Sequence, residues 1–535
     1  MTTKAPVVVF GNGGVLGGDG RVHEAVAVSG GRVVALGTDA LELGSVTVDL
    51  GGGLLLPAFR DGHSHPLWGG IDQNRLPLNG LRSVEEIVDA VATYARANPA
   101  LTWIIGGPYD PSTLPYGRGD ATWLDRATDR PVALFAADYH TAWVNSAALA
   151  VAGIDASTPD PELGEIIRRS DGSPCGMLVE FGALELIEAH FPEPTEAERA
   201  AGLATGLDHF SRLGVVWAQD AAATAADGAT YLAAARSGVL PVRVNLAWRA
   251  EPDKWRRDRD AFAALAAEIT ADPSCAGRLS AETVKFFADG VIEQGTGALL
   301  EPYEDEPHSC GLPNWSPEAL AEAVRAFAAD GRQIHVHAIG DGGVRMALDA
   351  IEHAQAELGP LRRPVIAHTQ LVDPTDRPRF AELGVVANFE PLWARLDSDM
   401  TELTMPRLGP HRSALQYPIA TLHRMGAAVS FGSDWPVSSA NPLEGLAVAV
   451  TRQTPDGEPV GGWLPEERMP ILDAIGAYTS GSAHQAFDDD RGAISPGMVA
   501  DFTLVEADIT AMAGAEIADV ATAGVWMEGR EVWRD

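Results

Sequence analysis

The chain has 535 residues, which is too long for one simple hydrophobic core, so two or three domains or one large barrel with additions are expected. Hydrophobic residues make up 46% and charged residues 21%, proportions that are typical of a folded globular protein. The formal net charge of −35 argues against nucleic-acid and anionic-membrane partners, because their phosphates would be repelled.

The sequence also shows no sign of secretion or of a thiolate metal site. The three cysteines, Cys175, Cys275 and Cys310, are too scattered for a disulfide framework or a cysteine zinc site. The N-terminal stretch MTTKAPVVVFGNGGVLGG lacks a cationic leader with a long apolar core, and no apolar run approaches ~20 residues. We therefore expect a soluble cytoplasmic protein, with no nucleic-acid or membrane partner.

Both ends of the chain are predicted to be β-rich. Residues 1–56 contain short strand-like runs with glycine turns (APVVVF, AVAVSGGRVVALG, SVTVDLGGGLLLP) and no helical stretch. The C-terminal segments GAISPGMVADFTLVEAD and VATAGVWMEGREVW have the same character. These patterns predict one small β domain that is built from both termini.

The long middle of the chain alternates strands with helices. SVEEIVDAVATYARANP has apolar residues at a spacing near 3.6, a serine at its start and a proline at its end. The segment 318–359 is predicted to form helix, strand, loop and helix in turn. Repeated units of this kind predict parallel strands covered by helices, and at this length a (β/α)8 barrel is favoured over a doubly wound sheet.

The first potential metal ligands follow an apolar run, in LLLPAFRDGHSHPLWGG. Side chains two residues apart in a strand point to the same side, so His63 and His65 can direct two imidazoles at one point. Such a pair suits a metal ion, and a chance pair of surface histidines is the alternative interpretation.

Four further strand-like runs carry residues of the same type. They are ETVKFFADG with Lys285, RQIHVHAIGD with His335 and His337, PVIAHTQ with His368, and AAVSFGSDWPV with Asp434. Functional residues of a barrel lie at the C-terminal ends of its strands. One histidine at a strand end is commonly structural, but five such strand ends in chain order indicate a shared site.

These motifs resemble those of the amidohydrolase superfamily of metal-dependent hydrolases, and most closely its family 3 branch, which includes N-substituted formamide deformylases. The matching segments are DGHSHP (61–66), DYHTAWVNSAAL (138–149), GSPCGMLVE (172–180), VKFFADG (284–290), HAIGD (337–341), AHTQ (367–370), GSDWPV (432–437) and GAISPGMVADFTLVEAD (492–508). The resemblance implies an α/β fold in three parts. These are a (β/α)8 metallo-hydrolase barrel (57–489), a composite β-sandwich (1–56 plus 490–535) and an α/β insertion in the barrel (75–180). It also implies a homodimer by family analogy.

The same resemblance implies a binuclear metal centre. Its ligands would be His63, His65, Lys285, His337, His368 and Asp434, with the first two on the more buried ion. Lys285 would bridge the ions as a carbamate formed with CO2, because a lysine ammonium has no lone pair to offer a cation. These donors suit zinc, with manganese, cobalt or iron as alternatives. An unmodified Lys285 would favour a mononuclear site.

Residues around the metals are predicted to shape the pocket. The substrate-binding candidates are His140, Trp143, Asn145, Glu293, Glu390, Trp393 and Trp435, with local packing as the alternative for each. His335 is interpreted as a pocket residue or a support for a ligand, and Asp289, Asp341 and Ser433 as residues that hold loops or ligand imidazoles. Two positions depart from the family pattern: Ala367 stands where relatives often have glutamate, and Glu390 where they often have glutamine.

The implied activity is hydrolysis of non-peptide C–N bonds in small amides, N-substituted formamides or N-acyl compounds. A metal-activated hydroxide would attack the carbonyl, and Asp434 would pass the proton to the leaving amine, which makes Asp434 and Lys285 the catalytic candidates. A mononuclear zinc deaminase is one alternative, which Lys285 and the lack of a glutamate in HAIGD disfavour. A hydrolase of carbamates, esters or cyclic amides, and a metal-free binding protein on the same fold, are the others.

Overall fold

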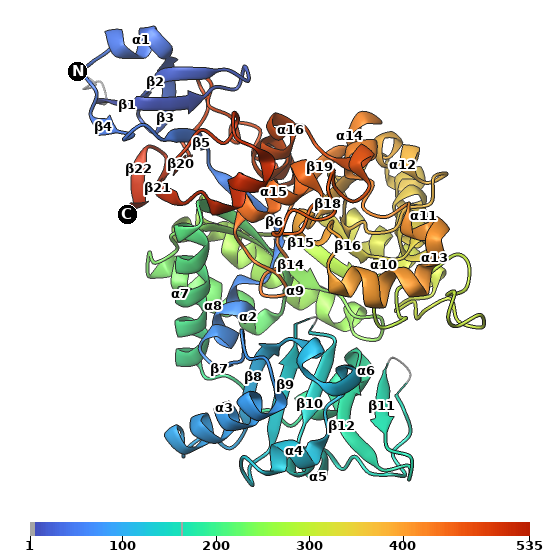
Figure 1. The fold of residues 1–535 in the computed structure, drawn as a ribbon. Helices are drawn as coiled ribbons and strands as arrows, with labels where there is room; N and C mark the ends of the chain where they lie inside the picture. The colour runs from blue at the N-terminus through green and yellow to red at the C-terminus, as the bar shows by residue number, and fades with distance from the viewer. Residues whose placement is uncertain (1–5, 138, 162–163, 535) are drawn as a thin grey trace. The chain divides into compact units, whose positions relative to one another are not determined.

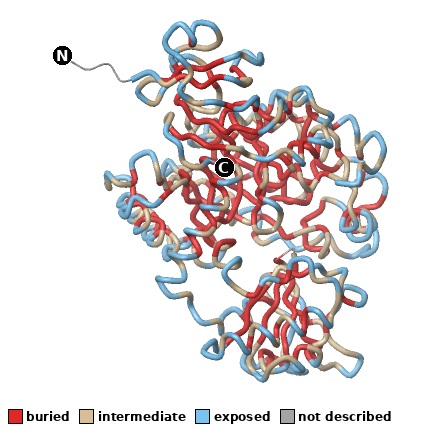
Figure 2. Tube along the Cα trace, turned by 60° about the vertical axis from the view of Figure 1, so that its left-hand side comes forward, coloured by how far each residue is buried: buried red, intermediate tan, exposed pale blue. Residues whose placement is uncertain are grey.

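The computed structural model describes residues 6–137, 139–161 and 164–534. The chain divides into two compact units: Met1–Pro66 with Leu207–Asp535, and Leu67–Gly206. In both units the buried parts of the chain, red in Figure 2, gather in the interior.

A sheet of eight parallel strands forms the centre of the first unit, in the order β19-β18-β17-β16-β15-β14-β13-β6 (Figure 1). The strands are β6 (Phe59–Ser64), β13 (Val215–Ala223), β14 (Arg243–Arg249), β15 (Leu279–Phe287), β16 (Gln333–Ala338), β17 (Val365–His368), β18 (Val386–Phe389) and β19 (Ala428–Phe431). The two end strands approach each other, since the backbone N–H groups of Ser433 and Asp434 donate to the His63 carbonyl at 3.2 and 2.7 Å. The predicted barrel is therefore confirmed.

The barrel strands are buried almost throughout, because helices cover them on the outside and side chains fill the inside. The helices of this unit that follow residue 195 are α7 (Glu196–Arg212, which begins in the second unit), α8 (Ala225–Arg236), α9 (Trp255–Ala271), α10 (Pro317–Ala329), α11 (Asp341–Leu358), α12 (Arg377–Glu382), α13 (Met405–Ser413), α14 (Ile419–Arg424), α15 (Pro442–Thr451), α16 (Ile471–Gly476) and α17 (Ser482–Gln485). Helix α10 illustrates why these segments form helices. Ser316 caps its first turn, Pro317 follows, and Leu320, Val324 and Phe327 face the core.

A second sheet of this unit joins the two ends of the chain, blue and red in Figure 1. Its order is β22-β21-β20-β5-β1-β2-β3, with β4 beside β1. The strands are β1 (Val7–Leu16), β2 (Val22–Ser29), β3 (Arg32–Leu36), β4 (Val48–Asp49), β5 (Leu54–Pro57), β20 (Phe502–Val505), β21 (Thr522–Met527) and β22 (Arg530–Arg534). Phe10 packs edge-to-face on Phe502 and Trp526, each at 5.4 Å, so the core of the sheet needs both termini.

One short helix departs from the all-strand prediction for residues 1–56. Helix α1 (Gly37–Glu42) follows β3, and Gly37 has a positive φ of 61° that turns the chain out of the strand. Ala40, Leu41 and Glu42 are good helix formers without β-branches, and this local preference was missed in a Val-rich and Gly-rich region.

The second unit contains a six-stranded sheet in the order β11-β12-β10-β9-β8-β7. Its strands are β7 (Leu76–Pro77), β8 (Ile104–Tyr109), β9 (Val132–Ala136), β10 (Thr141–Val144), β11 (Glu165–Arg168) and β12 (Pro174–Val179), and its helices are α2 (Pro66–Gln73), α3 (Val84–Ala97), α4 (Ala121–Asp125), α5 (Ser146–Ala152) and α6 (Phe181–Glu188). Helix α3 is the helix expected after Ser83, whose side chain accepts the Glu86 N–H. The unit includes the predicted insertion 75–180 together with α2 and most of α7. No helix among the described residues is long and apolar enough to cross a bilayer.

Candidate metal centre

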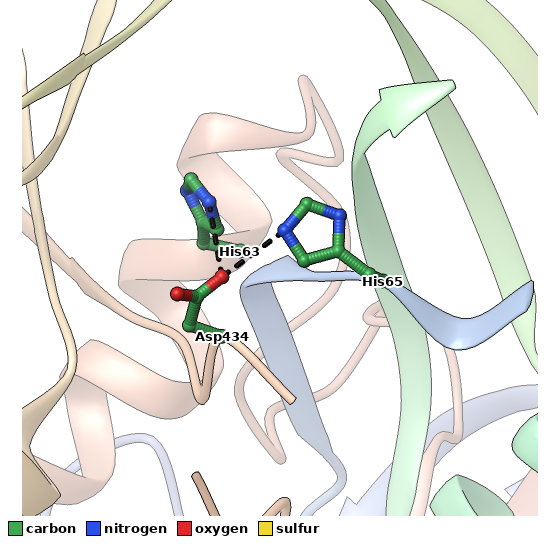
Figure 3. A group of neighbouring side chains, drawn as sticks. All are labelled: His63, His65 and Asp434. Carbon is green, nitrogen blue, oxygen red and sulfur yellow. Dashed lines mark hydrogen bonds and ion pairs between the residues drawn. The ribbon is translucent and has the colours of Figure 1, made fainter. Parts of the chain in front are cut away.

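Three side chains from the carboxyl ends of β6 and β19 meet in the barrel: His63, His65 and Asp434 (Figure 3). Asp434 Oδ1 lies 3.1 Å from His65 Nε2 and 3.5 Å from His63 Nε2. The donor atoms of the three buried residues lie within 4.8 Å of one another. Two imidazole nitrogens and one carboxylate oxygen that converge in this way can hold a divalent metal ion.

The turn after β19 places Asp434 in this cluster. Asp434 has a φ of 53°, in the left-handed region that non-glycine residues rarely adopt. The Asp61 carboxylate fixes the turn, because it accepts the Ser433 hydroxyl at 2.6 Å and the N–H groups of Ser433 and His63 at 3.1 Å each. Burial raises the pKa of Asp61 to about 7, even though these hydrogen bonds favour the carboxylate.

Lys285 on β15 lies against the same cluster. The side chain is fully buried, and its Nζ lies 3.0 Å from His63 Nε2 and 4.7 Å from the centre of the Phe287 ring. Burial lowers the pKa of Lys285 to about 7, while Asp434 and Glu390 oppose that change. A large fraction of this amine is therefore neutral near pH 7.

His337 and His368 complete the group of six predicted ligands. The His368 ring centre lies 4.6 Å from that of His63 and 4.5 Å from that of His337. His337 Nε2 is 3.2 Å from the Gly290 carbonyl. The structure thus places His337 and His368 next to the cluster of His63, His65 and Asp434.

The electrostatics favour the forms that bind metals. Burial, and then the nearby Lys285, hold the pKa of His63 well below its usual value, so its imidazole is neutral and has a free lone pair. Burial opposes the charge on Asp434, but the hydrogen bond with His65 and the nearby His368 keep its pKa below the ordinary value. Asp434 is therefore an anion, as a ligand and proton acceptor must be.

His335 contacts the ring of His63 on the side away from the cluster, at Nδ1. Its Nε2 lies 2.9 Å from Nδ1 of His63, so it holds that ring with Nε2 directed at Asp434 and Lys285. Its own Nδ1 is buried and has no hydrogen-bond partner among the described residues. His335 therefore lies where a support for a ligand is expected.

Glu390 and Trp393 both contact the ring of His368. Glu390 Oε2 lies 2.9 Å from His368 Nδ1, and the Trp393 ring stacks on His368 with a 3° interplanar angle and 5.3 Å between centres. Burial raises the pKa of Glu390, and His368 opposes the change. Within the part of the chain that the structure describes, its Oε1 is buried without a hydrogen-bond partner. Both residues thus border the metal cluster.

Two other pocket candidates of the first unit have structural contacts. Glu293 accepts a hydrogen bond from the Thr404 hydroxyl. Trp435 is 5% exposed, stacks on His209 at 5.1 Å and meets Phe210 edge-to-face at 5.5 Å. Their substrate contacts stay predictions.

The predicted loop supports make the contacts expected of them. Asp289 accepts the backbone N–H groups of Ala298, Ile339 and Gly340 at 2.9, 3.1 and 2.8 Å, and Asp341 accepts that of Leu300 at 3.0 Å. Asp289 Oδ1 also lies 3.7 Å from His337 Nε2. These carboxylates therefore fix the loops that follow β15 and β16.

The remaining candidates belong to the second unit. His140 Nδ1 lies 2.8 Å from Glu180 Oε2. Trp143 and Asn145 are fully buried: the Trp143 indole donates to the Asp120 carbonyl, and the Asn145 side-chain oxygen accepts the backbone N–H of Ala148 in α5 and that of Val132 in β9. These contacts show a packing role, and a role in substrate binding stays a prediction for all three. Asp138, the first residue of their motif, lies outside the described residues.

One buried carboxylate near the cluster was missed in the sequence. Asp220 lies in β13 and accepts the Tyr231 hydroxyl at 2.7 Å. Burial raises its pKa to about 6, and the nearby His65 opposes that shift. The signal was the run VVWAQD, an apolar strand that leads to a carboxylate in the same way as the other site strands.

Comparison with known proteins gives a consistent result. The model of a family described as "Amidohydrolase family" matches residues 46–533. The putative amidohydrolase YtcJ of Bacillus subtilis is 30% identical over 494 residues, which cover 88% of this chain and 87% of that protein. An N-substituted formamide deformylase of Arthrobacter pascens is 25% identical over 523 residues, covering 95% and 94%. An uncharacterized metal-dependent hydrolase of Pyrococcus furiosus shares the fold, with a TM-score of 0.73, 24% identity and coverage of 94% and 100%.

Proposed function

The chain belongs to the amidohydrolase family of C–N bond hydrolases, and we propose that it hydrolyses small non-peptide amides, with N-substituted formamides as the leading class. The observation that carries the proposal is the convergence of His63, His65 and Asp434 at the carboxyl end of the barrel. The N-substituted formamide deformylase supports the choice of substrate class, because its sequence is similar to this chain over 95% of the chain's length.

We further propose that the site binds two divalent ions, zinc in the first place, bridged by a carbamate on Lys285. The buried histidines and carboxylate are donors that suit zinc. The neutral amine is the form that adds to CO2, and the lowered pKa of Lys285 supplies that form near pH 7. When bound, such ions lower the pKa of water and polarise a substrate carbonyl.

The protein's own residues supply the remaining chemistry. The Asp434 carboxylate, anionic and directed into the cluster, accepts the proton of the attacking water and returns it to the leaving amine nitrogen. His335 and Glu390 keep the rings of His63 and His368 in place during the reaction. Trp393 covers one face of His368 and limits the access of bulk water to it.

A substrate panel tests this proposal. The protein is purified with supplied zinc and bicarbonate and assayed for amine release from N-alkyl and N-aryl formamides, the matching acetamides, and carbamates. We expect turnover of the formamides to exceed that of the other compounds, and Asp434→Asn to lower it at least about 100-fold. Asp473→Asn, a carboxylate change on α16, is the matched control. Turnover of none of these amides by metal-loaded protein would contradict the proposal.

A further inference from the structure

A cavity of about 290 Å³ lies at the amino end of the barrel, away from the metal cluster. Arg243 and Leu279, the first residues of β14 and β15, line it. His63 and His368 lie instead at the carboxyl ends of their strands. Because parallel strands share one direction, the two sites are at opposite ends of the barrel, and the cavity is not part of the proposed active site.

The cavity is cationic although the chain as a whole is acidic. Its charged lining residues are Arg243, Arg278, Arg362, Arg491, Glu282 and Asp488. Four arginines and two carboxylates line the cavity, in a chain with a net charge of −35. A concentration of positive charge of this kind in a concave site attracts anions.

Most of these arginines are already paired. Arg362 donates to Glu282 at 2.8 Å, and Arg243 and Arg491 share the Asp501 carboxylate at 2.8 and 2.6 Å. The pairs hold the guanidinium groups in fixed positions, so the cavity is preorganised. One lining arginine forms no such close pair among the described residues.

That arginine is Arg278, which is half-buried in the cavity wall. Among the residues that the structure describes, no carboxylate lies within 4 Å of its guanidinium, and its Nη1 contacts the Met527 sulfur at 3.7 Å. Burial, and then the neighbouring Arg243, lower the pKa of Arg278, while the more distant Glu528 and Asp501 oppose that change. The Nε atom of Arg243 is also buried and has no hydrogen-bond partner among the described residues. An anion bound between the two guanidinium groups would give Arg278 a close negative charge and Arg243 Nε a hydrogen-bond acceptor.

Aromatic rings form part of the wall. Trp217 and Phe487 line the cavity, with the Arg60 guanidinium 4.9 Å from the Trp217 ring and that of Arg362 4.5 Å from the Phe487 ring. These contacts fix the rings, which offer a carbon skeleton an apolar surface beside the cationic groups.

We propose that this cavity binds a small organic anion, whose carboxylate or phosphate oxygens contact the Arg278 guanidinium while its carbon skeleton packs against Trp217 and Phe487. Arg243 and Arg491 bind Asp501 just before β20 of the terminal sheet, so a bound anion would also stabilise the contact between this sheet and the barrel.

Isothermal titration calorimetry of the metal-loaded protein tests the proposal, with succinate and phenyl phosphate as separate probes at constant ionic strength. Arg278→Gln removes the unpaired charge, and Arg257→Gln, an exposed arginine of α9 paired with Asp258, is the matched control. Both variants keep the metal cluster, so anion binding at the metals would not distinguish them. Arg278→Lys keeps the charge but loses the planar fork, and covers the case in which Arg278→Gln does not fold.

We expect saturable binding of at least one probe to the parent protein and to Arg257→Gln, and at least tenfold weaker binding to Arg278→Gln or Arg278→Lys. The probe that binds identifies the preferred group, carboxylate or phosphate. The proposal is overturned if neither probe gives saturable heat, or if the Arg278 variants bind as tightly as the control.

Discussion

The Glu390 carboxylate lies 2.9 Å from Nδ1 of His368, so the residue that departs from the family pattern directly contacts a predicted metal ligand. The position before His368 is Ala367, which cannot offer a carboxylate. Glu390 reaches the ring from the carboxyl end of β18, the next strand of the barrel. An anionic partner on Nδ1 fixes the ring and raises the basicity of Nε2.

Glu390→Gln should therefore weaken metal binding at His368 about 10- to 100-fold, because the neutral amide keeps the shape but loses the charge. Competition with a chelator, followed by the metal content per chain, measures the effect. Glu301→Gln changes an exposed carboxylate and should bind metal like the parent protein. Equal metal affinity in Glu390→Gln and in this control would show that Glu390 does not support the ligand.

The pKa of Lys285 predicts how the metal-free protein regains activity. Burial lowers this pKa to about 7, so the amine is mainly ammonium at pH 6 and mainly neutral at pH 8. Since only the neutral amine adds to CO2, recovery with zinc and bicarbonate should be faster at pH 8 than at pH 6. Carbon-13 NMR with labelled bicarbonate should show a carbamate signal that Lys285→Ala lacks. Full recovery at pH 8 without a carbamate signal would contradict this account.

The turn that carries Asp434 depends on Ser433. Its hydroxyl donates to Asp61 at 2.6 Å and accepts the Trp435 N–H at 3.0 Å, and all three residues are buried. Ser433→Ala removes the partner of the Trp435 N–H and of Asp61 Oδ2, and should lower the free energy of unfolding by about 1–3 kcal/mol, as measured by urea denaturation. Ser439→Ala, at an exposed position a few residues later, should change it by less than about 0.5 kcal/mol. Unchanged stability in Ser433→Ala would remove this hydrogen-bond network from the explanation of the turn.

The contact between the terminal sheet and the barrel depends on Asp501. This buried carboxylate pairs with Arg243 and Arg491, and Asp501→Asn should cost about 3 kcal/mol because it removes the buried anion that the two arginines share and leaves them only Glu528 at the surface side. Asp519→Asn is the exposed control, and urea denaturation measures both variants. Stability of Asp501→Asn close to that of the control would contradict the assignment.

The ion pairs of Asp501 also predict how the stability of the protein depends on pH. Burial works against the Asp501 charge, but Arg243 and Arg491 hold its folded-state pKa below the ordinary value. A depressed folded pKa gives stability that is complete above the unfolded pKa of about 4 and is lost as the pH falls through the folded value. The loss of stability below about pH 4 should therefore be less steep in Asp501→Asn than in the parent protein.

The sequence predicted much of the site because strand period and strand ends are local features. Alternation in DGHSH put His63 and His65 on one side, and the apolar runs before His368 and Asp434 marked where barrel strands end. The composite sheet was visible because both termini carry short alternating strands. The family resemblance, rather than any local pattern, supplied the ligand set.

Contacts between distant strands could not be predicted in this way. Nothing local indicates that His335 meets His63 or that Glu390 meets His368, since these contacts depend on the register of parallel strands. The contacts of Trp143 and Asn145 could not be predicted from the sequence either. Their motif left both a pocket role and local packing open, and the structure shows the packing contacts, while a role in substrate binding stays a prediction.

Metal stoichiometry tests the central claim most directly. Elemental analysis of protein produced with supplied zinc and bicarbonate should give two ions per chain, and Lys285→Ala should give one or none. Arg278→Gln, at the other end of the barrel, should keep both ions. A parent protein without bound metal, or with a full complement of metal after His63, His65 and Asp434 are all replaced by alanine, would contradict the account.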